Sequence, residues 1–236
     1  MERRGEATIS ERLGAVAQYC LRGARVADVA GDHARLSEYL LLSGIARSVI
    51  CTDLNDAPVR KALARLAGAV GAEVRQGDGL APIGPGEVDV VCIAGISGRL
   101  TARILGDGAT TLSDVSRLIV QPLCHERDLR EWLMVNGWRL ISETLVEERG
   151  RQYDTFVATP GDGEAPYRSG DLEALLELGP FLSARPSAAF GRKWREKLKH
   201  LRVVADGRRR SEDLVGADEA DALIAAVQTV LDRGRP

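Results

Sequence analysis

Aromatic residues are scarce in this chain of 236 residues, where they make up 4%. A nucleic-acid surface built on stacked bases would therefore have few platforms. Zinc and redox sites also find little support, because the four cysteines form no C-x-x-C pair. Two of the cysteines, Cys51 and Cys92, lie inside apolar runs, where cysteine behaves as a small buried hydrophobe. We therefore expect a reduced, cytoplasmic protein that binds no metal.

Long hydrophobic runs and a strong net charge are missing as well. No segment reaches the ~20 apolar residues that a membrane-spanning helix needs, and the first residues lack the apolar core of a signal peptide. We therefore expect a protein with no membrane partner. The formal net charge of −2 indicates no partner by itself. Hydrophobic residues reach 44%, which is enough for a sizeable core and excludes wholesale disorder.

The first 160 residues alternate between short apolar runs and segments whose apolar residues have helical spacing. Strands are predicted over 25–30, 48–53, 72–79, 88–95, 117–122, 139–148 and 152–160. Helices are predicted over 10–21, 34–44, 57–71, 98–108 and 126–137. Five alternations with short connections predict right-handed βαβ units and a parallel sheet. The last two strands can only form a hairpin, so this α/β sheet of seven strands is doubly wound with an antiparallel last strand.

The composition changes after Pro160, where the stretch PGDGEAPY is rich in glycine and proline and is typical of a linker. Helices are predicted beyond it, over about 170–180, 187–207 and 218–234. We therefore expect two domains, an α/β domain over 1–160 and a helical domain over 161–236. A monomer is the favoured oligomeric state.

Aspartate and glycine recur where the predicted parallel strands end. The first two strands end at Asp28 and Asp53, the next two in QGDG (76–79) and AGISG (94–98), and the fifth at Gln121. An open sheet of this kind binds ligands beyond the carboxyl ends of its strands. Each residue alone is also typical of a turn or a helix cap, so the prediction of a binding site depends on the whole row.

The chemistry of this row fits an adenosine-containing ligand. Asp53 can accept both ribose hydroxyls, and Asp78 can accept from the exocyclic amine of adenine. Asp28 can hold an ammonium group, and Asp32, near a helix start, would repel a pyrophosphate but suit a cation. The turn VADVAGDHARLS contains the single glycine Gly31 instead of the G-x-G-x-x-G of NAD sites. These features favour S-adenosylmethionine (SAM), which carries a sulfonium and an ammonium and no phosphate.

Six segments resemble, in this order, those of the bacterial tRNA (adenine-22-N1)-methyltransferases: ISERL, ADVAGDHARLS, QGDGL, IAGISG, QPLCHERDLREWL and GPFL…FGRKW. The resemblance covers roughly residues 8–200, and its most specific parts are GDHARL and QP…LREWL. It implies a class I methyltransferase domain with a Rossmann-like sheet and a C-terminal helical, coiled-coil-like domain. It also implies that SAM is the cofactor and that N1 of adenosine 22 in tRNA is methylated.

The resemblance places cofactor contacts on the strand ends and substrate contacts beside them. The implied cofactor residues are Asp28, Ala30, Gly31, Asp32, His33, Asp53, Leu54, Gly77, Asp78, Gly79, Ala94 and Gly95. Four residues near the mouth of the implied site face the substrate, namely Ser10, Arg12, Ser97 and Leu123.

The chain departs from the family pattern at three places. The family has glycine and then serine where this chain has Ala30 and Gly31, so a positive φ at the first position would strain Ala30 by roughly 1 kcal/mol. The family's GMGG is GISG here, with Ile96 and Ser97. Its QPN is QPL, with Leu123 in place of an amide.

The last two departures fall where the target base is expected. N1 of adenine is a free lone pair at neutral pH, so catalysis is mainly positioning of N1 against the methyl group. The cationic product needs an acceptor for its N6 amino group, which an asparagine would supply and Leu123 cannot. We hypothesise that Gln121, Asp32 or a backbone carbonyl of residues 94–97 takes this role, which makes Gln121 and Asp32 the catalytic candidates.

Basic residues are concentrated between Arg185 and Arg210, a segment that contains ten Lys and Arg and only two acidic residues. A basic element on an otherwise acidic body is typical of an arm that contacts phosphates. The proposed RNA contacts are Arg192, Lys193, Arg195 and Lys197. The alternative is a solvated helix face. Apolar residues at helical spacing within this segment, from Phe190 to Leu201, predict that its other face packs on the body or on a partner helix.

Three other functions stay open. A non-catalytic protein that binds SAM and RNA is favoured by Ile96, Ser97 and Leu123. A methyltransferase acting on a different substrate is the second. An NAD-dependent dehydrogenase is the most distant, because the glycine fingerprint is missing and the closing hairpin is typical of methyltransferases.

Overall fold

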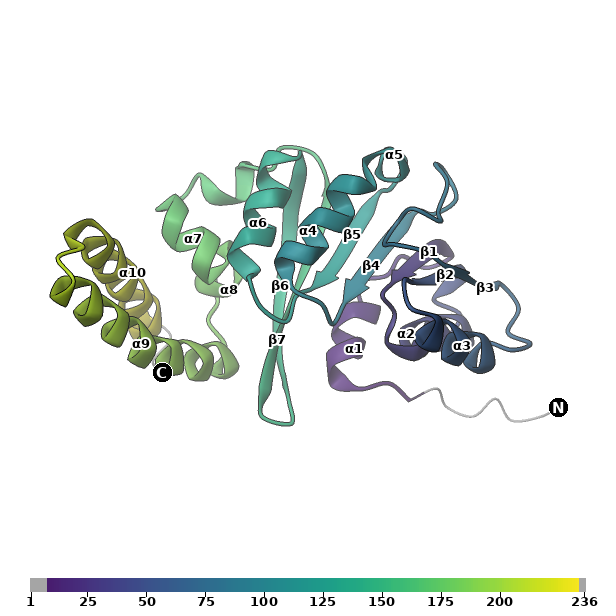
Figure 1. The fold of residues 1–236 in the computed structure, drawn as a ribbon, viewed down its shortest axis with the longest axis horizontal. Helices are drawn as coiled ribbons and strands as arrows, with labels where there is room; N and C mark the ends of the chain where they lie inside the picture. The colour runs from purple at the N-terminus through teal and green to yellow at the C-terminus, as the bar shows by residue number, and fades with distance from the viewer. Residues whose placement is uncertain (1–7, 234–236) are drawn as a thin grey trace. The chain divides into compact units, whose positions relative to one another are not determined.

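The computed structural model describes residues 8–233, apart from the side chain of Asp32. Within this range, seven strands form one sheet in the order β3-β2-β1-β4-β5-β7-β6 (Figure 1). The strands are β1 (Ala24–Val29), β2 (Ala46–Asp53), β3 (Ala72–Gln76), β4 (Val90–Ala94), β5 (Arg117–Gln121), β6 (Trp138–Glu148) and β7 (Arg151–Pro160). The first five pair in parallel, and β7 runs antiparallel to β5 and β6. The expected α/β class with an antiparallel last strand is confirmed.

Helices cover both faces of the sheet. They are α1 (Glu11–Ala17), α2 (Arg35–Leu42), α3 (Asp56–Arg65), α4 (Gly98–Asp107), α5 (Ala109–Leu112) and α6 (Glu126–Val135), with the short turn η1 (Asp32–Ala34) before α2. The apolar residues of α1 and α2 are buried on one face and those of α4 and α6 on the other. Because side chains alternate along a strand, Cys92 of β4 packs on the face covered by α1 and α2, and Ile93 packs on the face covered by α4 and α6. Its burial on both faces confirms the expectation for this continuously apolar strand.

Several element boundaries differ from the expected ones, among them the ends of α1, α3 and β3. The first helix ends at Ala17 rather than at residue 21. Beyond Ala17, the N–H of Cys20 donates to the Ala17 carbonyl, three residues back, which tightens the turn that follows the helix. The third helix ends at Arg65, because Gly68, with a φ of 76°, turns the chain. The third strand ends at Gln76, and the residues that follow it turn back toward α4.

Contacts divide the chain into two compact units, Met1–Gly163 and Glu164–Pro236. The described part of the second unit is helical, with η2 (Ala165–Tyr167), α7 (Leu172–Leu178), α8 (Pro180–Ala184), α9 (Ala188–Arg210) and α10 (Leu214–Arg233). α9 and α10 pack side by side and are joined by three residues, which makes them an antiparallel pair (Figure 1). The apolar face of α9 is buried, as its spacing predicts, through Phe190, Trp194 and Leu198.

No helix in the described range is long and apolar enough to cross a membrane. Nor do three or more of the described His, Cys, Asp or Glu side chains gather as a metal site requires. The absence of a bound metal and the monomeric state stay predictions.

Candidate active site

The first turn of the site follows β1 and is built around the carboxylate of Asp28. This side chain is 2% exposed, and its Oδ2 accepts hydrogen bonds from the Ser37 backbone N–H at 3.2 Å and from the Ser37 hydroxyl at 2.6 Å. Asp28 therefore braces the first turn of α2 against the end of β1. Burial, and after it the charge of Asp28, raises the pKa of the Cys51 thiol on the neighbouring strand.

Gly31 is required by the position of that carboxylate. A Cβ added to this residue would lie 2.8 Å from Cγ and Oδ2 of Asp28. Real Cβ atoms do not approach other atoms so closely, and the hydrogen bonds to Ser37 hold the carboxylate in place. The glycine thus lets the turn close over a buried acid.

The same turn holds three residues in the left-handed region although none of them is glycine. Ala30, His33 and Ala34 have φ values of 53°, 55° and 59°. Each costs on the order of 1–3 kcal/mol, and such strain concentrates at functional sites. The N–H of Ala30 donates to the Thr52 carbonyl at 2.9 Å, which ties the strained residue to β2. Ala30 therefore has the positive φ that we predict would strain an alanine at this position.

The ends of β2 and β3 are tied together at Asp53. Its Oδ1 accepts the Asn55 N–H at 2.9 Å, and its carbonyl accepts the Gly77 N–H at 3.0 Å. Asp53 forms no ion pair with a described residue, so Oδ2 is open to a ligand. The next residue, Leu54, is 56% exposed, and its carbonyl accepts from the Gln76 amide at 3.2 Å.

The turn after β3 packs against α4. Gly79 has a φ of 56°, and a Cβ there would lie 2.7 Å from Cγ2 of Ile104. The Thr52 hydroxyl donates to the Gly79 carbonyl at 2.9 Å. The preceding residue, Asp78, is half exposed, and its carboxylate lies 3.4 Å from Nη2 of Arg103. Arg103 must therefore move if Asp78 is to accept from an adenine amine.

The loops that follow β4 and β5 are joined by three backbone hydrogen bonds. The N–H groups of Gly95, Leu123 and Gly98 donate to the carbonyls of Gln121, Ile96 and Cys124, at 3.2, 2.9 and 2.8 Å. These bonds continue the pairing of the two strands past Ala94, the last residue of β4. We name this pair of loops, residues 95–98 and 122–125, the double loop. The three hydrogen bonds fix its backbone at the carboxyl edge of the sheet.

Two predicted substrate residues lie on the double loop. The Ser97 hydroxyl caps α4 by accepting the Leu100 N–H at 3.2 Å. The Leu123 side chain is 47% exposed, although its backbone is fixed. The double loop therefore presents an apolar group to solvent where the resemblance places the target base.

Gly98→Ala is expected to disrupt the double loop. The added Cβ would lie 2.1 Å from the carbonyl oxygen of His125, a backbone atom that cannot rotate away. We expect a loss of about 1–3 kcal/mol in the free energy of unfolding, because the two loops must separate. Urea unfolding measures it, and Gly207→Ala, at a helix glycine with open space around it, is the control. Equal stability of the two variants would contradict the rigid double loop.

α1 brings Arg12 to the same edge of the sheet. The Ser10 hydroxyl caps this helix by accepting the Leu13 N–H at 3.4 Å. The Arg12 backbone N–H donates to Oε2 of Glu148 at 2.8 Å, and this bond is the main cause of a lowered pKa for Glu148. The Arg12 guanidinium lies 5.5 Å from the centre of the Tyr153 ring. The sequence carried no signal for Glu148 or Tyr153, because both reach the site through contacts between distant segments.

Gln121 joins α1, β5 and β7 from beneath the site. It is 1% exposed, and its Nε2 donates to the Arg12 carbonyl at 2.9 Å and to the Thr155 hydroxyl at 2.8 Å. Its Oε1 lies 3.5 Å from Nη1 of Arg12. Both hydrogens of the amide are therefore used within the protein, and only the oxygen has capacity left. The other catalytic candidate, Asp32, has a side chain outside the described residues.

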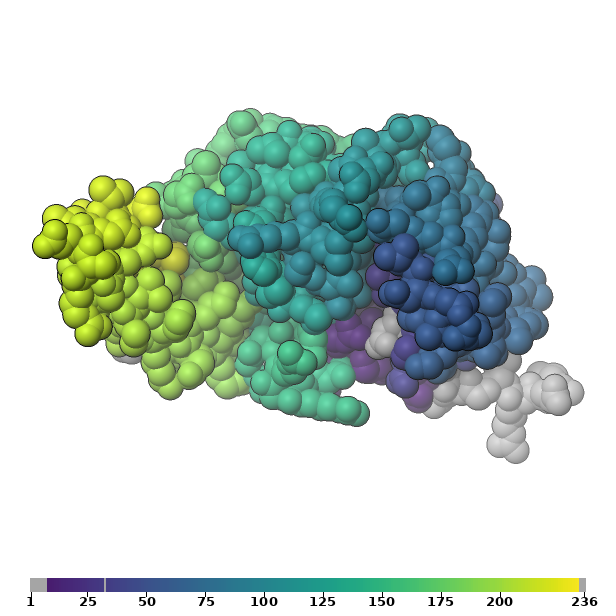
Figure 2. Space-filling model, in the orientation of Figure 1, coloured from purple at the N-terminus to yellow at the C-terminus, as the bar shows by residue number. Residues whose placement is uncertain are grey.

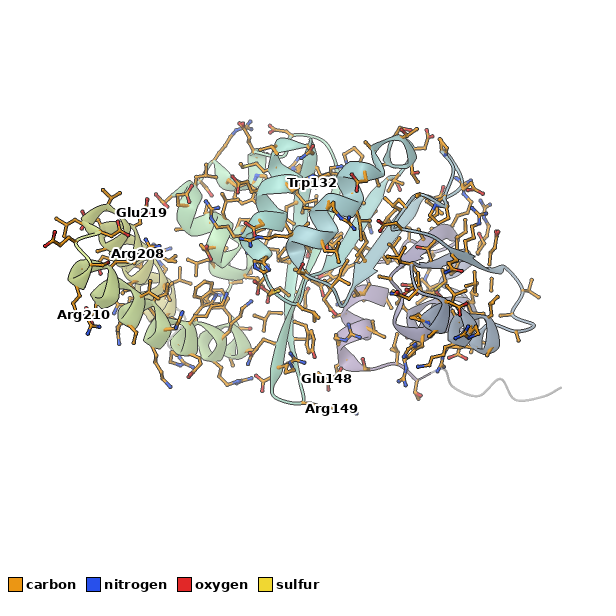
Figure 3. All side chains as sticks on the ribbon, in the orientation of Figure 1. Trp132, Glu148, Arg149, Arg208, Arg210 and Glu219 are labelled. Carbon is orange, nitrogen blue, oxygen red and sulfur yellow. The ribbon has the colours of Figure 1, made fainter. Side chains whose placement is uncertain are left out.

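The predicted RNA contacts of the basic segment lie in the second unit, on α9. Its first half carries Arg192, Lys193, Arg195 and Lys197. Lys197 lies with its ammonium 4.7 Å from the centre of the Trp194 ring. Near the other end, Arg208 pairs with Glu219 of α10 at 3.6 Å (Figure 3). Arg209 pairs with Asp221 of the same helix. Two arginines near the end of α9 therefore pair with α10, and the role of the four residues of its first half as RNA contacts stays a prediction.

A sheet that winds outward from β1 in both directions, ends in an antiparallel strand and carries aspartate and glycine at its carboxyl edge defines a class I methyltransferase domain. The chain belongs to the tRNA (adenine(22)-N(1))-methyltransferase family, TrmK, whose model matches residues 26–227. Membership of this family confirms the resemblance that the sequence motifs carry.

Curated and solved relatives agree with this assignment. The chain is 39% identical over 202 residues to the tRNA (adenine(22)-N(1))-methyltransferase of Bacillus subtilis (strain 168), which covers 84% of this chain and 85% of the relative. It is similar to the crystal structure of B. subtilis TrmK, with a TM-score of 0.89, 34% identity, and coverage of 96% and 100% of the two chains. It is also similar to Sp1610 of Streptococcus pneumoniae in complex with SAM, with a TM-score of 0.83, 32% identity, and coverage of 95% and 100%.

Proposed function

We propose that this chain is a SAM-dependent tRNA methyltransferase that methylates N1 of adenosine 22. The observation that carries the proposal is one edge of a class I sheet, where the strained turn after β1, Asp53 and the double loop come together. Family membership over most of the chain supplies the substrate, tRNA. The cytoplasmic location stays a prediction.

The residues at this edge fit SAM. Asp53 would accept from the ribose through its open Oδ2, and the exposed Leu54 beside it would pack on the adenine. Asp78 would accept from the adenine amine once Arg103 has moved. Gly95, with a φ of 89° and only Nη1 of Arg12 near its missing Cβ, leaves the backbone open to the methyl-bearing end. Asp28 shapes the turn through its hydrogen bonds from Ser37, and its contact with the ammonium group of SAM stays a prediction.

The chain's own residues orient the base and need not act as a strong base. When bound, SAM supplies an electrophilic methyl group on a sulfonium. The lone pair of adenine N1 is free at neutral pH, so the protein contributes mainly the alignment of N1 with that group. Oε1 of Gln121 is a candidate acceptor for the N6 amino group, and it would exchange its long contact with Arg12 for this bond. The Asp32 carboxylate and the carbonyls of residues 94–97 are the other candidates.

Transfer of radiolabelled methyl from SAM to unmodified tRNA tests the proposal. We expect label on a tRNA with adenosine at position 22 and none on the same tRNA with guanosine there. Calorimetry with SAM alone is the control for an intact cofactor site. Absence of label from both tRNAs, with SAM still bound, would favour a non-catalytic protein or a methyltransferase with another substrate.

A further inference from the structure

The hairpin of β6 and β7 extends well beyond the rest of the sheet. β5 ends at Gln121, which lies beside Thr155 of β7. Pairing of the two hairpin strands continues past this level, from Thr144 opposite Thr155 to Glu148 opposite Arg151. We name residues 144–155 the hairpin arm, which reaches about 15 Å beyond the end of β5 at ~3.4 Å per residue. It stands out from the sheet on the side where the site lies (Figures 1 and 2).

The tip of the hairpin arm is a tight turn that exposes two arginines. Arg149 and Gly150 have φ values of 52° and 77°, the left-handed pair that matches the twist of a two-residue hairpin. Arg149 lies at the tip (Figure 3), and Arg151 follows the turn. Both are exposed, and neither forms an ion pair with any residue in the described range.

The acidic residues of the hairpin arm are held within the protein. Glu148 accepts the Arg12 backbone N–H at 2.8 Å, and the field of Arg149 contributes to the lowering of its pKa. Glu147 accepts from the Gln152 amide at 3.4 Å. The guanidinium groups therefore face solvent, while the two carboxylates are turned toward protein donors.

One face of the hairpin arm leads from the site to this tip. Thr155, Tyr153 and Arg151 share it, because alternate residues of a strand point the same way. Thr155 accepts from Gln121 at the inner end, and the Arg12 guanidinium lies over Tyr153 in the middle. The order outward from the site is a hydroxyl, an aromatic ring and a cation.

We propose that the hairpin arm binds the RNA strand next to the target nucleotide, with a base stacked against the pair of Tyr153 and Arg12 and with Arg149 and Arg151 on phosphates. This inference depends on the proposed function, which supplies an RNA substrate. N1 lies on the pairing edge of adenine, so the target must be unpaired when it reacts. Proteins hold unpaired RNA by stacking its bases on aromatic and guanidinium planes and by placing cations along its backbone.

The double variant Arg149→Gln/Arg151→Gln tests the phosphate contacts. Its matched control is Arg22→Gln/Arg139→Gln, which removes two exposed arginines at the opposite edge of the sheet, before β1 and at the start of β6. We expect the arm variant to bind unmodified tRNA about tenfold more weakly at 0.1 M salt. Its dependence of log K on log salt should be shallower by about 1.4–1.8, at 0.7–0.9 per lost phosphate contact. SAM affinity and kcat should stay at the wild-type values, and KM for tRNA should rise.

Tyr153→Phe and Tyr153→Ala distinguish base stacking on the Tyr153 ring from a role of this residue in keeping the hairpin folded. Phenylalanine keeps the ring and should keep wild-type affinity for tRNA, whereas alanine should weaken it by about ten- to hundredfold. Thermal unfolding of both variants shows whether the hairpin is intact.

The outcomes also separate this inference from the proposed function. Wild-type protein that binds tRNA but transfers no methyl group would contradict the proposed function, while the arm would still be judged by binding. Equal tRNA affinity and salt dependence in the arm and control double variants would overturn the arm as an RNA contact. Wild-type protein that binds no tRNA would overturn both.

Discussion

Gly31→Ala is expected to weaken SAM binding by about ten- to hundredfold, which corresponds to the 1–3 kcal/mol of an overpacked site. The new Cβ would lie 2.8 Å from the Asp28 carboxylate. Asp28 cannot swing away, because it is 2% exposed and holds both the N–H and the hydroxyl of Ser37. The turn must therefore shift outward, into the space beyond the end of β1 where SAM is proposed to bind.

Ala30→Gly is the matched change at the adjacent residue, and it should act in the opposite direction. Alanine in the left-handed region costs about 1–2 kcal/mol, and glycine removes this strain. Glycine also raises the conformational entropy of the unfolded chain, which offsets part of the gain in stability. Because Ala30 has a φ of 53°, we expect Ala30→Gly to raise the free energy of unfolding by about 0.5–1 kcal/mol. SAM affinity should stay near the wild-type value.

Calorimetric titration with SAM and thermal unfolding measure both variants. The swapped variant Ala30→Gly/Gly31→Ala moves the glycine to the position where the family has it, and it should still bind SAM weakly because the clash with Asp28 remains. Wild-type SAM affinity in Gly31→Ala, with the protein folded, would mean that the turn after β1 is not part of the cofactor site.

The sheet and the edge that carries the site could be predicted from local patterns. Apolar strands alternate with helical segments, and a polar residue or glycine lies at or next to the end of each parallel strand, so Asp28, Asp53 and Asp78 could be placed on one edge. The role of an individual residue could not be read in this way. Asp28 is predicted to hold an ammonium group, and the structure adds a second role that the sequence did not show, because Asp28 also braces α2 through Ser37.

Contacts between distant segments account for most of what the sequence did not show. Arg12 meets Glu148 across 136 residues and Gln121 across 109, and no periodicity links these positions. The length of the hairpin arm was also hidden. Its strands were predicted, but how far they pass beyond β5 depends on the register of β7 against β5.

Arg130→Met is expected to lower the free energy of unfolding by about 3–5 kcal/mol, the usual cost of removing one partner from a buried ion pair. Arg130 lies on α6 with a fully buried side chain. Its Nε donates to Glu143 of β6 at 2.7 Å, its Nη2 lies 3.7 Å from Asp154 of β7, and its guanidinium lies 4.4 Å from the Phe156 ring centre. Methionine fills a similar volume, so the loss reflects the two carboxylates left without their cation.

Arg99→Met is the matched control, because Arg99 also pairs with an acid, Asp128 of α6, but at an exposed position. Exposed pairs contribute little, so this variant should unfold close to wild type. Chemical unfolding at neutral pH measures both. Equal stabilities would mean that water or a rearranged partner compensates Glu143 and Asp154.

The same substitution should affect RNA binding more than cofactor binding. Asp154 is flanked by Tyr153 and Thr155 and lies opposite Leu145, so the buried cation fixes the base of the hairpin arm from the α6 side. The cofactor residues lie on β1 to β4, away from this cluster. At a temperature where Arg130→Met stays folded, KM for tRNA should therefore rise while SAM affinity is kept. A parallel loss of both would show that Arg130 supports the whole sheet rather than the arm.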